Sequence, residues 1–402
     1  MMKSVPVLYY IYKLLLYLSL ILFSCKFGES FPRAKAGILD LQNWDFKTNP
    51  ILQLEGEWEF YWNEFCFSNK GNLNPVCNPE KKTSFINMPK LWNSLSYINS
   101  NPPISGIGYA THRLFIQTNT EEVLALRLQN VYTAYKLWVN GVLLVEVGHV
   151  STSSTHGKPR LFPVIVDLPS AKNGIEIILQ ISNFYHKKGG AWRKIYLGPK
   201  EKILLEKELD TGIDLFISGC LCFVGFYHII YFYYRKKDRA TFYFGAFSLV
   251  IALRILLVEE PFLYRVIPNF PYNLGMKLEF LTSFLPAPLF VLFISEFLYF
   301  TGLQKNNRID YSITFPQFIF SAFIMFIPPS IFTHTLPILY IFIIISILYV
   351  IVKLSIAIKE KTIGAYFISF TFIILLIFSI NDVLYTETII NTGYYISYGF
   401  LF

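Results

Sequence analysis

One polar stretch in the first half of the sequence gathers side chains suited to binding a small ligand. Residues 148–160 carry His149, Ser151, His156 and Arg160, between two runs of β-forming residues. Loops held on a rigid scaffold are where binding groups concentrate. We therefore predict a ligand site in this stretch, and the alternative is a mobile, solvated connection.

Two tryptophans are candidates for aromatic faces against which such a ligand stacks. They are Trp92 and Trp192. Trp58, Trp62 and Trp138 lie instead in strand-like runs, so we expect them in a hydrophobic core.

Three ionisable residues interrupt long apolar runs in the second half. Arg254, Glu279 and Asp382 fall at similar positions near one end of their runs. Ionisable side chains within a membrane are costly and tend to be paired or functional. We predict a polar cluster in which Arg254 pairs with Glu279 or Asp382 and which couples movement of the exported domain to movement of the helices. The alternative is that each side chain extends separately to the membrane interface.

The remaining reactive side chains do not indicate an enzyme. There is no Gly-rich phosphate loop, no kinase or cyclase motif and no Cys/His spacing typical of zinc. We expect neither catalysis nor a metal or other cofactor. Cys66 and Cys77 lie close together in a stretch rich in Asn, Gly and Pro, where a disulfide is expected if this part is exported, with two free thiols as the alternative.

The apolar runs of the second half have the length of membrane-spanning helices. A helix needs about 20 apolar residues to cross about 30 Å of hydrocarbon. The predicted spans are residues 211–234, 240–258, 276–300, 311–331, 336–358 and 362–383, and a seventh begins near Gly393. The sequence ends at Phe402, about ten residues into this seventh run, so we expect a fragment of a longer product or the remnant of a degraded gene, with its output part missing.

Basic residues predict how these spans are oriented. They collect in alternate connections, at residues 235–239, 305–308 and 353–361, whereas the other connections are nearly free of Lys and Arg. Because short cytoplasmic loops retain Lys and Arg, we expect these three connections in the cytoplasm and everything before residue 211 outside. Much of the net charge of +8 is explained in this way, so we expect lipid contact and no nucleic-acid binding.

The first residues have the features of a targeting segment. Lys3 and Lys13 flank an apolar stretch that ends in Ser24-Cys25. We predict a secretory signal over residues 1–25, with Cys25 as an acylated lipoprotein residue, ordinary cleavage nearby or an uncleaved anchor over residues 5–23 as the three forms left open.

Short β-forming runs separated by turn residues fill the region between the targeting segment and the first membrane span. They lie at residues 57–62, 109–117, 123–128, 134–139, 142–147, 161–168 and 175–181, and Asn140-Gly141 is a strong hairpin signal. We predict an all-β exported domain over residues 37–200 (a β-sandwich or jelly roll), a linker over 201–210 and an all-α seven-helix bundle over 211–402.

Ordered motifs in the exported part resemble the galactose-binding-like jelly roll, which also forms the sugar-binding domain at the front of β-galactosidase-type hydrolases. They are MPKLW (88–92), GIGYATHRL (106–114), AYKLWVNG (134–141) and IILQISN (177–183). The resemblance implies a carbohydrate-like ligand.

Later motifs extend the resemblance to nearly all of residues 40–402. They are GGAW (189–192), IYLG (195–198), GFYH (225–228), YRKKD (234–238) and ALR (252–254). Together they resemble the bacterial seven-transmembrane receptors that carry diverse intracellular signalling modules. This family implies a sensory receptor of the bacterial inner membrane, with its β-domain in the periplasm.

The leading interpretation is therefore a receptor that binds a small, carbohydrate-like ligand outside and signals inside, through a missing output domain or a cytoplasmic signalling partner. A homodimer is one expectation for its assembly. A transporter or membrane enzyme with an accessory carbohydrate-binding domain is the alternative, and a non-signalling adhesion protein is a third. Of these, a transporter would show helices broken in repeated halves, and only Pro286 and Pro288 break one helix.

Overall fold

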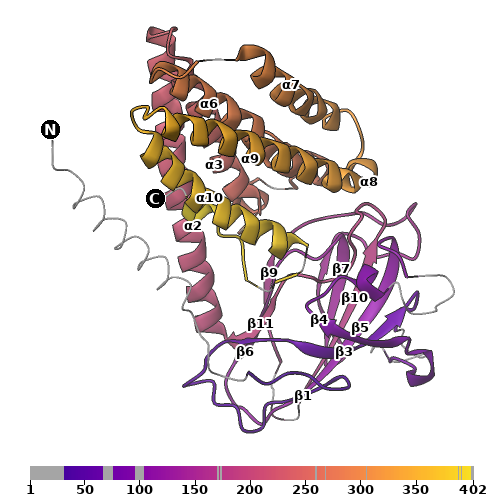
Figure 1. Cartoon of the computed structure of the whole chain (residues 1–402). Coiled ribbons are helices and arrows are strands. Elements are labelled where there is room, and N and C mark those ends of the chain that lie inside the picture. Colours follow the sequence, from indigo (N-terminus) through magenta and orange to yellow (C-terminus); the bar gives the residue numbers. More distant parts are fainter. Residues whose placement is uncertain are drawn as a thin grey trace.

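A β-rich body followed by a bundle of helices makes up the computed structural model (Figure 1). The structure describes residues 31–399 except 67–75, 96–103, 170–171, 173, 259, 268, 305, 388 and 391. The order of the two parts agrees with the predicted fold class. The predicted signal segment, including Cys25, lies outside the described residues.

The β-domain consists of two sheets. The larger has the strand order β4-β3-β5-β10-β7-β8, with β1 pairing parallel to β5; the smaller has the order β2-β11-β6-β9. The strands are β1 (Ile38–Asp40), β2 (Leu52–Gln53), β3 (Gly56–Trp62), β4 (Ser84–Met88), β5 (Gly108–Gln117), β6 (Leu124–Leu128), β7 (Ala134–Val139), β8 (Val142–Val147), β9 (Val164–Asp167), β10 (Ile175–Asn183) and β11 (Ile195–Pro199).

One hydrophobic core joins the two sheets, which is what defines a sandwich. It contains Trp58 and Leu179 from the larger sheet and Leu126 and Leu197 from the smaller. The β7–β8 hairpin turns at Asn140-Gly141 as predicted, and both residues have the positive φ that this turn requires. Trp138 is an exception to the expected core, because alternation along β7 turns it away from the sandwich interior, where its indole N–H donates to Gln180 Oε1.

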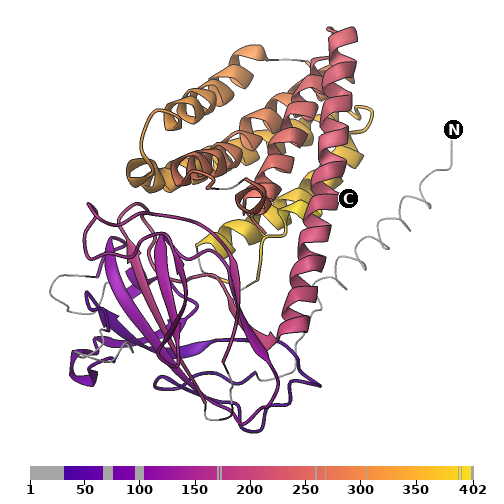
Figure 2. The ribbon, with the colours of Figure 1, turned by 180° about the vertical axis from the view of Figure 1, so that it is seen from behind.

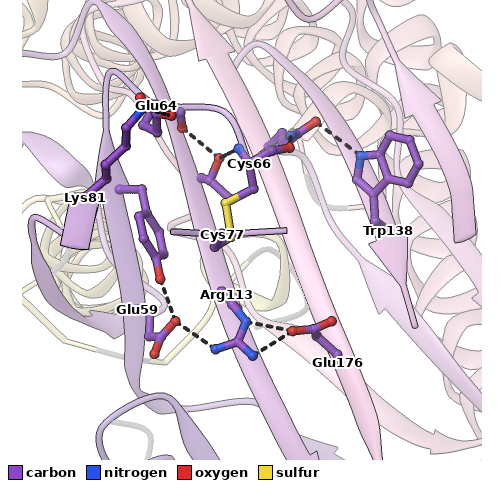
Figure 3. Close-up of a disulfide and its surroundings, with 11 residues drawn as sticks. Glu59, Glu64, Cys66, Cys77, Lys81, Arg113, Trp138 and Glu176 are labelled. Carbon is purple, nitrogen blue, oxygen red and sulfur yellow. Dashed lines mark hydrogen bonds and ion pairs between the residues drawn. A yellow bond between two sulfur atoms is a disulfide. The ribbon is translucent and has the colours of Figure 1, made fainter. Parts of the chain in front are cut away.

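Cys66 and Cys77 form a disulfide beside the outer face of the larger sheet (Figure 3). On the same face, Arg113 contacts Glu59 at 2.9 Å and Glu176 at 2.7 Å. The disulfide ties the end of β3 to the segment that leads into β4, as the sequence predicted.

The helices follow the predicted spans with shifted ends. They are α2 (Lys200–Tyr234), α3 (Arg239–Val258), α4 (Phe262–Val266), α5 (Tyr272–Phe284), α6 (Pro286–Phe300), α7 (Asn307–Ile324), α8 (Pro329–Phe332), α9 (Leu336–Lys359), α10 (Ala365–Thr386) and α11 (Ile396–Gly399). Among the described residues, five stretches are long and apolar enough to cross a membrane: 200–234, 239–258, 272–300, 329–359 and 365–386.

Two helix predictions need correction. The expected linker 201–210 is helical, because α2 begins at Lys200, directly after β11. The expected span 311–331 is instead α7, which ends at Ile324 and carries polar residues on its buried side, among them Asp310, Thr314 and Gln317. The break between α5 and α6 lies where proline was expected to interrupt the helix, since Pro286 has no backbone N–H to donate.

The β-domain sits at one end of the bundle, and α2 runs from it along the whole bundle (Figures 1 and 2). The connections with basic residues, such as 235–239 between α2 and α3, lie at the opposite end, because each helix that leaves the β-domain side ends there. Lys353 was expected in such a connection, and this is wrong: it lies inside α9 and is buried.

Candidate functional site at the domain junction

The predicted ligand loop 148–160 is held by its own hydrogen bonds. His149 N donates to Lys158 O at 2.8 Å, Lys158 N donates back at 3.1 Å, and Arg160 N donates to Thr133 O at 2.9 Å. The four candidate side chains there point to local partners: the His149 ring lies 3.3 Å from Glu146, the Ser151 hydroxyl accepts from Ser153 N, His156 Nδ1 contacts Ser153 and Thr155, and Arg160 lies over Phe162. They do not line the cavities described below, and ligand binding at this loop stays a prediction.

Trp92 does not offer a stacking face, contrary to expectation. Its side chain is 0% exposed and its indole N–H donates to Gly106 O at 3.2 Å. Gly189 packs so closely on its ring that a Cβ there would lie 2.4 Å from it. The ring therefore fills the core beneath the larger sheet, where a ligand cannot reach it.

Trp192 lies at the junction between the β-domain and the helices. Its ring is parallel to that of Tyr132 at a centroid distance of 6.3 Å, and it is tilted against Tyr385 of α10 at 5.9 Å. The Arg193 guanidinium lies over Trp192, Tyr385 and Tyr394. Aromatic and cationic groups of both parts are thus packed into one contact region.

Arg254, Glu279 and Asp382 lie around one cavity, so the predicted polar cluster has a common location. The expected pairing of Arg254 with a carboxylate is wrong in its details. Its guanidinium donates to the backbone oxygen of Glu279 at 3.3 Å and to the Ser283 hydroxyl at 2.5 Å. Asp382 instead accepts from the backbone N–H groups of Tyr395 and Ile396, at 2.7 and 3.2 Å, where α11 begins.

The cavity has a volume of about 400 Å³ and is lined from both sides of the junction. The β-domain contributes Tyr132, His186, Lys188 and Trp192. The ends of the helices nearest the β-domain contribute the polar residues Arg254, Glu279, Ser283, Tyr340 and Asp382, and an apolar part continues between α3, α6, α9 and α10. A neighbouring cavity of about 620 Å³ shares Trp192 in its wall.

Lys188 and Glu387 tie the β-domain to the end of α10. Lys188 Nζ donates to Thr386 O at 2.7 Å and lies 3.1 Å from Glu387 Oε1, which also accepts from the Tyr340 hydroxyl. Burial lowers the pKa of Lys188, although Glu387 opposes this. Burial alone would raise the pKa of Glu387, but the Tyr340 and Lys188 contacts lower it overall. The Lys188–Glu387 contact is thus a salt bridge between the β-domain and the end of α10.

A second ionic contact joins β6 to the helices. The buried guanidinium of Arg127 donates to Asp210 of α2 at 2.9 Å and bonds to Glu260, which follows α3. Glu260 also pairs with Arg265 of α4. Both Arg127 and Glu260 are buried, so these charges depend on each other for compensation. This contact could not be predicted from the sequence, because Arg127 lies in a strand-forming run with nothing to mark it as different from an ordinary strand residue.

The cavity at the junction offers polar and aromatic groups from both the β-domain and the helices to a small molecule. Within the described residues, no group of three or more His, Cys, Asp or Glu side chains is arranged to hold a metal ion. A molecule in the polar end of the cavity would contact the β-domain and the ends of α3, α5 and α10 at once.

Comparison with protein-family models finds a family match for the helical part. Residues 210–402 match the family model described as 7TM diverse intracellular signalling. A search of curated proteins found no match.

Among solved structures, β-glucuronidases from Faecalibacterium prausnitzii and Ruminococcus gnavus are 15% and 13% identical, each over 37% of this chain and over 31% and 27% of their own, with a TM-score of 0.28 for both. A β-galacturonidase from Eisenbergiella tayi is 13% identical over 37% of this chain and 24% of its own, with a TM-score of 0.25. This chain spans less than a third of the length of these enzymes, and likeness at these scores carries no argument about its function.

Proposed function

We propose that this chain, whose residues 210–402 are a domain of the 7TM diverse intracellular signalling family, is a transmembrane sensory receptor that binds its ligand at the junction between β-domain and helices. The supporting observation is the shared cavity, with Trp192 on one side and Glu279 on the other. A ligand shifts a conformational equilibrium only through different interactions with the two states. A ligand that contacts both the β-domain and the helices interacts differently with two states in which these parts are placed differently relative to each other.

We propose a small, neutral, hydroxyl-rich molecule of carbohydrate type as the ligand. Side chains of both signs line the polar end of the cavity: Arg254 and Lys188 are basic, and Glu279 and Asp382 are acidic. Hydroxyl groups both donate and accept hydrogen bonds, so they match such a mixture without adding an unpaired charge. The Trp192 ring adds an apolar face of the kind that binding pockets combine with a few polar groups.

The placement in the cell follows from the basic connections and is also a proposal. Arg235 and Lys237 lie at the end of the bundle remote from the β-domain, where a cytoplasmic location fits the retention of positive charge. The β-domain then lies in the periplasm, and the signal passes from the cytoplasmic ends of the helices to an output domain or a partner protein. We propose no catalytic activity for the described part.

Titration calorimetry on the full chain in lipid nanodiscs tests this proposal. The probes are neutral mono- and disaccharides applied one at a time. We expect saturable binding by at least one sugar, weakened at least tenfold by Glu279→Gln and by Trp192→Ala. Trp138→Ala is the matched control, because Trp138 lies on the outer face of the sheet and makes no contact with the cavity.

Two results would count against the junction site. One is binding that survives both cavity substitutions but is lost in His149→Ala or Arg160→Ala, which would move the site to the loop 148–160. The other is a complete lack of binding across the panel, which would reject a carbohydrate-type ligand.

A further inference from the structure

Three helices meet at one carboxylate oxygen inside the bundle. Asp310 Oδ1 of α7 accepts from Lys353 Nζ of α9 at 2.7 Å, from the Ser295 hydroxyl of α6 at 2.8 Å and from the Tyr349 hydroxyl of α9 at 2.5 Å. Lys353 Nζ also donates to Ser295 Oγ at 2.8 Å. The ion pair and the two hydroxyls form a closed network.

This network is buried and lies far from the β-domain. The exposed fractions are 1% for Asp310 and 8% for Lys353. Asp310 is in the first turn of α7, and Lys353 is within the last two turns of α9, so both are near the end of the bundle that carries the basic connections. Buried charges at such a place are costly unless they are paired, and removing one partner destabilises far more than replacing both.

The network is incomplete in one respect. The other oxygen of Asp310, Oδ2, is buried without a hydrogen-bond partner among the described residues. A buried carboxylate oxygen without a donor is unfavourable, so the closed arrangement is less stable than a fully satisfied one. A rearrangement that brings a donor or water to Oδ2 offsets part of the cost of opening. The closed and open arrangements of the network then differ little in free energy, as a two-state switching element requires.

Two of the three helices also reach the cavity at the junction. α6 lines the cavity with Pro286 and Phe290 and carries Ser295 at the network. α9 likewise carries Tyr340 at the junction and Lys353 at the network. A shift of either helix at the junction therefore acts on the network at the other end.

We propose that the Asp310–Lys353 pair is a latch that holds α6, α7 and α9 together at the end remote from the β-domain, and that its opening is the change that the receptor presents to its signalling partner. The latch is a property of the bundle, so it does not depend on which ligand binds at the junction. Its failure and the failure of the proposed ligand site are separable, because the test below uses no ligand.

Double electron–electron resonance, which measures the distance between two spin labels, tests the latch on the full chain in nanodiscs. Spin labels on Phe300→Cys and Ile356→Cys report the separation of α6 and α9, both positions being exposed, with Cys220 and Cys222 replaced by Ser. We expect Asp310→Asn and Lys353→Met each to move most of the population to a longer distance. Lys359→Met is the matched control on the same helix, since Lys359 is exposed, and it should keep the parent distance.

The double variant Asp310→Asn/Lys353→Met separates latching from folding. It leaves no unpaired charge, so it should regain much of the thermal stability lost in the single variants and still show the longer distance. Tyr349→Phe keeps the ion pair and should give a smaller shift in the same direction, which covers the case in which a single variant fails to fold. Parent-like distances in the folded double variant and in Tyr349→Phe would overturn the proposal.

Discussion

Burial sets the protonation state of two histidines in the β-domain. His112 packs against the rings of Phe60 and Trp92, at 5.2 and 6.3 Å, and burial lowers its pKa to about 4. His186 stacks on Tyr132 at 4.4 Å, and burial lowers its pKa to about 3. Both rings are therefore neutral at pH 7, and His186 contributes shape rather than charge to the cavity wall.

These two residues predict an acid-sensitive β-domain. Their folded pKa values lie below 6.5, so the unfolded state takes up protons first as the pH falls. Stability is complete above about pH 6.5, and at pH 5 each histidine costs about 2 kcal/mol. His112→Phe should reduce the loss of unfolding temperature of the purified chain between pH 7 and pH 5.

The exposed His156 provides the control for this measurement. His156→Phe should leave the difference in unfolding temperature between pH 7 and pH 5 unchanged. An equal pH dependence for the parent chain and His112→Phe would show that burial of His112 does not govern acid stability.

The structural role of some residues could be predicted from their type, and that of others could not. Asn140-Gly141 identified its hairpin because the turn chemistry is local. Trp92 and Lys353 were misplaced because both have neighbours from distant segments: Gly106 and Gly189 surround Trp92, and Asp310 pairs with Lys353. A lysine near the end of an apolar run has the same sequence pattern whether it faces water or a buried carboxylate.

At the scale of elements, α2 joins the two parts without a flexible hinge. It begins at Lys200, where β11 ends, and Arg127 on the neighbouring strand β6 is bonded to Asp210 two to three turns along α2. Strand and helix are thereby held at both their covalent joint and a side-chain contact. Movement of the smaller sheet should therefore be passed directly to α2.

Arg127 and Arg113 form a matched pair of arginines for testing this joint. Arg127 contacts three carboxylates and is buried at the junction, whereas Arg113 contacts two and is partly exposed on the outer sheet face in Figure 3. Arg127→Met should lower the free energy of unfolding by about 3–5 kcal/mol, and Arg113→Met by about 0–1 kcal/mol. Denaturant unfolding of the full chain measures both.

Hydrogen exchange localises the effect of these two substitutions. Arg127→Met should speed exchange in residues 200–212, while Arg113→Met leaves these amides as in the parent. Equal loss of stability in the two variants, with no local change in α2, would contradict a rigid joint at Arg127.

Strands with regular alternation of polar and apolar residues and helices with long apolar runs could be predicted. Elements with a weak sequence pattern could not. The strands from β5 to β8 and the helices α3, α9 and α10 lie within a few residues of their expected ranges. β1 and β2 were missed because they are only three and two residues long and pair with the distant strands β5 and β11. β4 and β11 were also not predicted. The first turns of α2 read as a linker because Lys200–Asp210 alternates charged and apolar residues, and they are helical because β6 and β11 pack against them.

At the scale of the whole molecule, orientation in the membrane is the first expectation to check. Reporter fusions after Lys237 and Lys361 should register the cytoplasm, and a fusion after Phe270 should register the outside, because the basic connections lie at the end remote from the β-domain. An exported reporter after Lys237 would refute this orientation.

Hydropathy and turn signals were sufficient to predict two bodies and their order along the chain, but not their contact. The junction is built from residues such as Lys188, Trp192 and Glu387, which are unremarkable in the sequence and meet only after both parts have folded. The cavity between the two bodies was therefore not expected from the sequence.

Transmission from the junction is the central claim, and hydrogen–deuterium exchange on the full chain in nanodiscs tests it most directly. The chain is compared without sugar and with a saturating neutral mono- or disaccharide chosen by calorimetry. The predicted result is slower exchange in residues 185–194 and 382–396 together, with altered exchange in 295–310, where the Asp310 network lies. Protection confined to residues 148–160, with the helices unchanged, would contradict the claim.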